Sequence, residues 1–170
     1  MERSCHFAYS GFQTYVATKI VTDKSKTTVA HLPTGVGKSF IAAMTGEYLR
    51  TVEGKRVAIV TTQSFLVGQM KRMLGTWTEN ISVLTMERAL LCHKDFDAFI
   101  IDESDECLLE AGVAIDHSVL QAIGFWDLME KRTILLTATI GFDLNIVLFE
   151  LFGIRQRDVL TFNKHLLDSK

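Results

Sequence analysis

The sequence has 170 residues, a formal net charge of −2 at pH 7 and 48% hydrophobic residues. This length suits one domain and is too short for two domains of usual size, and the composition excludes a disordered or fibrous chain. Because the charge is near zero, the surface as a whole is not polycationic, so any binding of nucleic acid must depend on a local patch.

The amino-terminal residues predict residence inside the cell, in the cytoplasm or the nucleus. They are polar and aromatic where a signal peptide would be apolar, and no apolar run approaches the length of a membrane span. Three cysteines, odd in number and widely spaced, disfavour a disulfide framework. Neither Cys5-His6 nor Cys92-His93 has the paired spacing of a structural zinc site.

Short apolar, β-branched runs alternate with helical stretches along the chain, which predicts βα units. The expected strands are Thr27–His31, Val57–Thr61, Ile81–Leu84, Ala98–Asp102, Thr133–Thr137 and Val159–Thr161. The expected helices are Phe12–Val21, Ser39–Arg50, Ser64–Leu74 and Phe142–Leu151, with two more after Asp105 and Asp116. Several strands are continuously apolar, as in a parallel sheet that helices cover on both faces. The predicted fold is a single α/β domain with a mostly parallel, twisted sheet.

The expected helix Phe142–Leu151 is apolar around most of its circumference. One stripe consists of Leu144, Val147, Leu148 and Leu151, and the remaining surface is left with little polarity by Phe142, Ile146 and Phe149. Two interpretations follow: the helix is buried on two sides, or part of its surface meets a neighbouring domain.

Residues 32–39, Leu-Pro-Thr-Gly-Val-Gly-Lys-Ser, are the most informative segment of the sequence. Gly35 and Gly37 permit a positive φ and a close approach of the backbone to phosphate, Lys38 can reach phosphate oxygens, and Ser39 can hold Mg²⁺. A helix that begins here adds the positive end of its dipole. The residues expected to bind ATP are Pro33, Thr34, Gly35, Val36, Gly37, Lys38 and Ser39. Leu32 replaces the first glycine of the strict pattern, and an ordinary glycine turn is the alternative.

Two carboxylates, Asp102 and Glu103, follow a buried strand, at the sheet edge where parallel sheets bind ligands. Asp102 is expected to hold Mg²⁺ together with Ser39, and Glu103 to act as the general base toward water, with Lys38 as the third catalytic residue. The alternative is that these acids are only solvated residues near a helix start.

Two threonines, Thr137 and Thr139, end the next apolar strand. Their hydroxyls can hydrogen-bond the acidic segment in one nucleotide state and release it in another, which would couple the site to a neighbouring surface. Selection for strand propensity alone is the alternative.

Together, LPTGVGKS at 32–39, DESD at 102–105 and TAT at 137–139 resemble the first RecA-like motor domain of superfamily 2 helicases and translocases, the ATP-binding domain of P-loop NTPase fold. The resemblance implies that Gln13 reads adenine, although a surface glutamine would look the same in sequence. It also implies that Thr61, Thr62 and Thr85 contact the backbone of single-stranded RNA or DNA. The spelling DESD identifies no subfamily and leaves RNA versus DNA open.

The same resemblance implies an ATP-binding domain over residues 1–165 and the start of a linker or tail over 166–170. It further implies a second RecA-like domain, in the same protein or in a partner chain, that supplies arginine fingers, so isolated turnover is expected to be slow. We therefore expect an ATP hydrolase or helicase domain with ATP and Mg²⁺ as cofactors, single-stranded nucleic acid as partner and no membrane association. Alternatives are a protein-translocating or remodelling motor of the same superfamily, a non-hydrolysing nucleotide-binding module, and a small-molecule kinase.

Overall fold

The structure, a computed structural model, describes residues 11–62, 64–75 and 81–163. Within these residues six strands form one sheet in the order β3-β2-β4-β5-β1-β6, and every neighbouring pair is parallel. The strands are β1 (Thr27–His31), β2 (Val57–Thr61), β3 (Ser82–Thr85), β4 (Ala98–Ile101), β5 (Arg132–Thr137) and β6 (Leu160–Thr161). The predicted parallel α/β fold is therefore confirmed.

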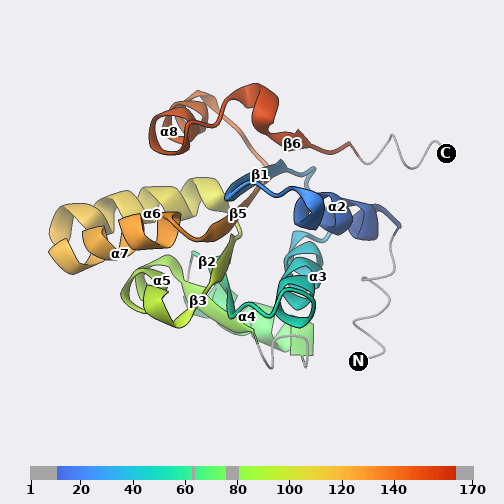
Figure 1. Ribbon diagram of the computed structural model, residues 1–170, viewed down its shortest axis with the longest axis horizontal. Helices are drawn as coiled ribbons and strands as arrows, with labels where there is room; N and C mark the ends of the chain where they lie inside the picture. The colour runs from blue at the N-terminus through green and yellow to red at the C-terminus, as the bar shows by residue number, and fades with distance from the viewer. Residues whose placement is uncertain (1–10, 63, 76–80, 164–170) are drawn as a thin grey trace.

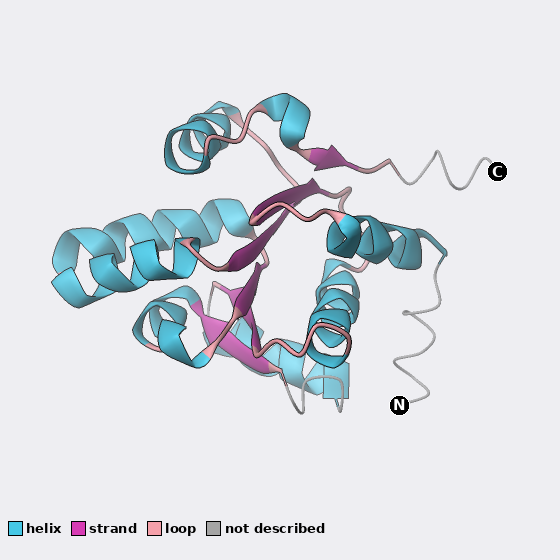
Figure 2. Ribbon diagram, in the orientation of Figure 1, coloured by secondary structure: helices cyan, strands magenta, loops and turns pink. Residues whose placement is uncertain are grey.

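Helices cover both faces of this sheet, as Figures 1 and 2 show. The first layer contains α2 (Gly11–Thr22), α3 (Lys38–Thr51) and α4 (Ser64–Leu74), and the second contains α5 (Met86–Leu91), α6 (Ser104–His117), α7 (Val119–Met129) and α8 (Phe142–Phe152). Each layer packs its own apolar cluster against the sheet, with Ile20 and Ile41 in one cluster and Leu90 and Leu128 in the other. Because the central strands β2 and β4 are buried along their whole length, their continuous apolar sequences are explained.

One helix of the structure was not predicted, and several strand ends differ from the predicted ones. Strand β3 begins at Ser82 instead of Ile81, and β4 ends at Ile101, so that Asp102 already lies in the loop. The missed helix, α5, has only six residues and too few turns to show helical periodicity. Its start carried a signal nevertheless, because the Thr85 hydroxyl accepts a hydrogen bond from the Arg88 backbone N–H as a helix cap.

Burial of α8 on two sides, one of the two interpretations of its sequence, is wrong. Leu144 and Leu148 pack into the core, but Ile146, Phe149 and Leu151 are 45%, 48% and 40% exposed. The helix therefore has one buried side and an apolar outer surface.

Some predictions lie outside the described residues. These are the proposed tail at 166–170 and the Cys5-His6 pair, so the domain boundaries stay predictions. Cys92 and Cys107 are both free thiols. Among the helices in the described ranges, none has the length and apolarity needed to cross a membrane.

Candidate functional site

The loop that is predicted to bind phosphate, called the phosphate loop from here on, connects the carboxyl end of β1 to the start of α3. Gly35 and Gly37 have φ angles of 75° and 81°, a region that glycine enters without strain, and α3 begins at Lys38. Leu32 is fully buried, and its backbone N–H donates to the Thr137 carbonyl at 2.9 Å. The departure from the strict motif at position 32 is thus explained by packing, since this residue extends β1 into the core.

Gln13 lies directly behind this loop. Its side chain is buried, and Nε2 donates to the Val36 carbonyl oxygen at 2.8 Å. A Cβ atom at Gly37 would collide with the same Nε2, the flexible end of the Gln13 side chain, so a residue other than glycine would displace this amide as well as strain the backbone. The alternative of a surface glutamine is wrong. The role of Gln13 in reading adenine stays a prediction. In the structure its amide donor is already bonded to the loop.

Lys38 joins the phosphate loop to the acidic segment after β4. Its Nζ lies 2.7 Å from Glu103 Oε1 and 3.7 Å from Asp102 Oδ1. Asp102 is only 6% exposed, and its Oδ1 accepts the Glu103 backbone N–H at 2.9 Å. Burial raises the pKa of Asp102 above its ordinary value, the Lys38 ammonium opposes that shift, and the Glu103 carboxylate adds to it. The structure therefore brings the three predicted catalytic side chains together.

Glu103 is held in an unusual backbone conformation. Its φ and ψ are 51° and 53°, which makes it the one non-glycine residue with positive φ in the part of the chain that the structure describes. A left-handed conformation costs an ordinary residue roughly 1–2 kcal/mol. The turn places the Glu103 carboxylate beside Lys38 while α6 begins at the next residue, Ser104.

Ser104 fastens the acidic segment to the sheet, a role that was not predicted from the sequence. Its buried hydroxyl lies 2.7 Å from the Ile101 carbonyl oxygen and 2.9 Å from that of Leu136, so it can donate to either strand end. The Cys107 thiol donates to the Asp102 carbonyl oxygen at 3.2 Å. The only sequence signal was a small polar residue directly after two carboxylates, which does not reveal its partners.

The two threonines after β5 have different partners. Thr139 Oγ1 donates to Asp105 Oδ2 at 3.2 Å, and it thereby connects this loop to the acidic segment. The Thr137 hydroxyl is instead bonded within its own loop, to the Thr139 carbonyl at 2.7 Å and the Thr139 N–H at 3.2 Å. Thr137 therefore shapes the turn that presents Thr139.

The three threonines assigned to strand binding lie at the same sheet edge, but their hydroxyls point inward or are engaged. Thr61 and Thr62 are 2% and 6% exposed, and Thr61 is in register with Thr85 across β2 and β3. The Thr85 hydroxyl caps α5. Lys71 and Arg72 on α4 are exposed. The contact of these three threonines with nucleic acid stays a prediction. Such a contact would use their backbone N–H groups more than their side chains.

The donor set fits a Mg²⁺–triphosphate complex. Ser39 is half-buried in the first turn of α3, and the buried Asp102 carboxylate follows β4, two strands away from β1 in the sheet, and lies beside Lys38. The described ranges contain no group of three or more His, Cys, Asp and Glu side chains able to hold a metal on their own. Mg²⁺ needs no such group, because it binds through one or two protein oxygens together with substrate phosphates and water.

No protein-family model matches the sequence, and no curated protein sequence matches it. Solved structures do match in fold. The UvsW helicase from bacteriophage T4 gives a TM-score of 0.62 at 16% identity, over 90% of this chain and 59% of that chain. A hypothetical ATP-dependent RNA helicase from Sulfolobus tokodaii gives 0.62 at 18% identity, over 95% and 57%. The Hef helicase domain from Pyrococcus furiosus gives 0.57 at 19% identity, over 89% and 37%.

These likenesses establish the RecA-like fold of the chain. The chain spans less than two thirds of the length of each of the three helicase structures.

Proposed function

We propose that this chain is the ATP-binding motor domain of a nucleic-acid-dependent ATPase or helicase, in which hydrolysis of Mg²⁺–ATP is coupled to binding or unwinding of a strand. One observation carries the proposal: Lys38 of the phosphate loop lies 2.7 Å from Glu103 and 3.7 Å from Asp102, at the carboxyl edge of a parallel sheet. An ordinary glycine turn would not be expected to place a lysine beside two carboxylates that follow a central strand of the sheet.

The loop at 33–39 would hold the phosphates. Backbone N–H groups around Gly35 and Gly37, the amino end of α3 and the Lys38 ammonium all favour anionic oxygens at one place. Ser39 and Asp102 would hold Mg²⁺. The bound Mg²⁺–ATP would supply the electrophilic γ-phosphoryl group and part of the charge neutralisation.

Glu103 would orient the attacking water and accept its proton. In the structure its carboxylate pairs with Lys38, so Lys38 must give up or share that contact to reach phosphate. Glu103 is partly exposed, with 39% of its side chain accessible, and it is therefore open to water when it is not paired. A general base of this kind contributes typically 10²–10⁴-fold to the rate.

The contact between Thr139 and Asp105 is the proposed coupling element. The two residues follow different strands, and one hydrogen bond of 3.2 Å joins them. A change around the acidic segment can therefore alter the loop after β5. Replacement of Thr139 by valine should leave ATP affinity within about 3-fold, since one exposed hydrogen bond contributes about 1 kcal/mol or less. Strand affinity should then no longer respond to ATP in the protein that contains both motor domains.

A second RecA-like domain, in the same protein or in a partner chain, would complete the motor. One observation supports this part of the proposal: the chain spans less than two thirds of the length of the matching helicase structures. The likeness to helicases also supports a nucleic-acid strand as the partner, with RNA and DNA still open.

A motor that translocates or remodels protein is the second candidate function. It is favoured by the burial of Thr61 and Thr62 and by the capping role of Thr85, since these hydroxyls are not displayed to a strand. Both candidates use the same nucleotide site and differ only in the molecule on which the motor acts, a nucleic-acid strand or a protein.

The test measures Mg²⁺–ATP binding by calorimetry and ATP hydrolysis by phosphate release, with and without single-stranded RNA or DNA, against a Lys38→Ala control. Binding that depends on Lys38, with slow turnover that one nucleic acid accelerates, is the expected result. Absence of ATP binding would overturn the nucleotide site itself. Binding without any response to either nucleic acid would favour the second candidate, and tight binding with no turnover under any condition would favour a non-hydrolysing module.

A further inference from the structure

The outer surface of α6, α7 and α8 is both acidic and apolar. The three helices contain no Lys or Arg, and every charged side chain on them other than His117 is a carboxylate. Large apolar side chains are exposed among these carboxylates: Leu109 is 73%, Leu120 71%, Trp126 55% and Phe149 48% accessible. Exposed apolar side chains gathered on neighbouring elements are typical of a contact surface. We call these three helices the α6–α8 surface.

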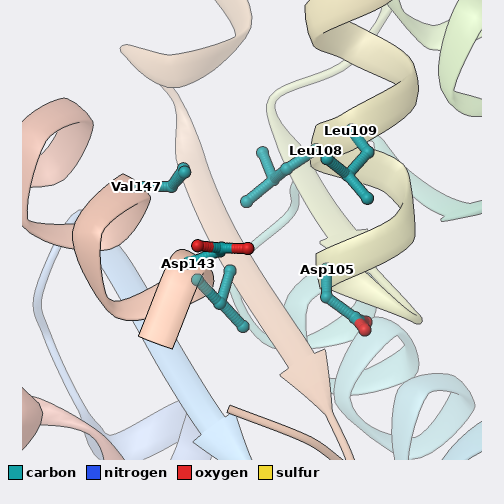
Figure 3. Close-up of a pocket in the computed structure, with 6 residues that line it drawn as sticks. Asp105, Leu108, Leu109, Asp143 and Val147 are labelled. Carbon is teal, nitrogen blue, oxygen red and sulfur yellow. The ribbon is translucent and has the colours of Figure 1, made fainter. Parts of the chain in front are cut away.

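A cavity of about 140 Å³ lies on this surface between α6 and α8. Figure 3 shows Leu108, Leu109 and Asp105 on the α6 side and Val147 and Asp143 on the α8 side. The walls are therefore apolar, and two carboxylates stand beside them. A cavity of about 150 Å³ accepts a group the size of benzene, so this one fits a single leucine, methionine or aromatic side chain.

The carboxylates at and near the cavity lack cationic partners on their own helices. Asp105 Oδ1 is buried and has no hydrogen-bond partner among the described residues, while Oδ2 is bonded to Thr139. Burial, together with the neighbouring carboxylates of Glu106 and Glu87, raises the pKa of Glu110. The surface thus holds like charges that a cationic partner would stabilise.

The chain itself shows which chemistry this surface accepts. The Arg155 guanidinium lies 5.7 Å from the centroid of the exposed Phe149 ring, the distance of a cation–π contact. A guanidinium or ammonium from another chain would find similar apolar and aromatic faces next to carboxylates elsewhere on the α6–α8 surface.

We propose that the α6–α8 surface docks a basic amphipathic helix of a partner protein, with one apolar side chain in the cavity and Lys or Arg residues one turn away beside Asp143 and Asp105. Charge complementarity selects this occupant. Nucleic acid is disfavoured because the three helices carry no Lys or Arg to neutralise phosphates, and the nearby Arg155 already lies over the Phe149 ring. A second copy in a symmetric arrangement would place carboxylates against carboxylates.

This inference goes beyond the proposed ATPase function and does not depend on it. Figure 1 shows α6 and α7 side by side, extending away from the sheet, so most of the surface is separate from the phosphate loop. Asp105 is the point at which the two regions meet, since it faces the cavity and also bonds Thr139.

The experiment uses the full chain and a fluorescent synthetic peptide of about 14 residues, roughly four helical turns, with leucines at alternating spacings of three and four and lysines elsewhere. The control peptides are a scrambled peptide, one with alanine in place of leucine and one with glutamate in place of lysine. Anisotropy measures affinity, and chemical-shift mapping locates the peptide. We expect binding at α6 and α8, with at least about 10-fold weaker binding for each control peptide.

Protein variants test the contributions of the charge and of the cavity to peptide binding separately. Asp143→Lys should weaken binding of the lysine peptide by about 10-fold and improve binding of the glutamate peptide. Val147→Phe should weaken binding of both peptides, because the larger side chain fills the cavity. Glu53→Lys, a charge reversal after α3 in the other layer, should change nothing. Absence of binding, equal binding of the scrambled peptide, or equal effects of Asp143→Lys and Glu53→Lys would overturn the proposal. Preferential binding of single-stranded nucleic acid at these helices, or a dimer that Asp143→Lys abolishes, would also overturn it.

Discussion

The two helical layers that cover the sheet are alike on the inside and different on the outside. Both bury an apolar cluster against the strands. The first layer, α2 to α4, carries more Lys and Arg than carboxylates, whereas α6 to α8 carry carboxylates and no Lys or Arg. Folding of a parallel sheet requires both faces to be covered, but it does not require this difference in charge. We therefore attribute the difference in charge to what the two layers contact or bind.

The proposed nucleotide site takes residues from both layers. Gln13 and Lys38 come from helices of the first layer, and Glu103 and Asp105 come from the turn before α6 and from α6 itself, in the second layer. We therefore propose that the first layer binds phosphate and the second supports turnover, and the following changes test that division.

The largest effect is expected at the pair of residues where the layers meet. Glu103→Gln should lower turnover by about 10²–10⁴-fold while ATP affinity stays nearly unchanged, because it removes the proposed base and keeps the proposed metal ligand Asp102. Lys38→Ala should instead lower ATP affinity by about 10- to 100-fold, since a charge-assisted hydrogen bond contributes about 1.5–3 kcal/mol. Calorimetry and single-turnover hydrolysis measure the two quantities separately. Equal loss of affinity in both variants would contradict the division.

A large loss of stability is expected where α7 packs against α5 inside the second layer. A Cβ atom at Gly124 would collide with the backbone carbonyl of Leu90, which cannot turn aside as a flexible side chain can. Gly124→Ala should therefore lower the free energy of unfolding by about 3 kcal/mol, measured by urea denaturation.

Gly112→Ala in α6 is the matched control, because nothing lies within 4 Å of its Cβ position. Alanine is the better helix former, so this variant should be stabilised by up to about 1 kcal/mol. A similar loss in both variants would mean that α5 and α7 are not closely packed.

A smaller effect is expected in the phosphate loop, on the side of the first layer. Gly37→Ala should reduce stability by about 2 kcal/mol and impair ATP binding, since alanine is strained at φ 81° and displaces the Gln13 amide from Val36. Gly35→Ala has the same kind of strain but open space around its Cβ, so about half that loss is expected. If Gly35→Ala were the more damaging to stability, the contact with Gln13 would not matter.

The smallest effect lies at the amino ends of the strands, far from both proposed sites. The Arg56 guanidinium and backbone N–H hold the pKa of Asp97 at about 2, below its ordinary value. Because the folded pKa is the lower one, this stabilisation is present above about pH 4 and is lost as the pH falls toward 2. The pair is exposed, so Asp97→Asn should cost less than about 1 kcal/mol at pH 7. The difference from the wild type should shrink as the pH approaches 2 and vanish below it in acid-unfolding curves.

The sequence predicted those parts of the fold that depend on local patterns. Continuous apolar runs located the central strands, and the lysine of the phosphate loop and the two carboxylates after β4 are brought together as expected. Position along the chain suffices here because the carboxyl ends of parallel strands meet at one edge.

Contacts between distant residues could not be read from the sequence. The bond from Gln13 to Val36 and the Ser104 hydroxyl between two strand ends depend on the direction in which side chains point after packing. The same holds for the burial of Thr61 and Thr62, which periodicity within one strand cannot decide when a sheet is covered on both faces.

The left-handed backbone at Glu103 sets stability and function against each other at one position. Glycine at residue 103 would relieve about 1 kcal/mol of strain, and asparagine a part of it, yet neither carries the carboxylate that turnover is proposed to need. A library selected only for thermal resistance should therefore become enriched in inactive chains with glycine or asparagine at this position. Glutamate should return only when hydrolysis is selected as well.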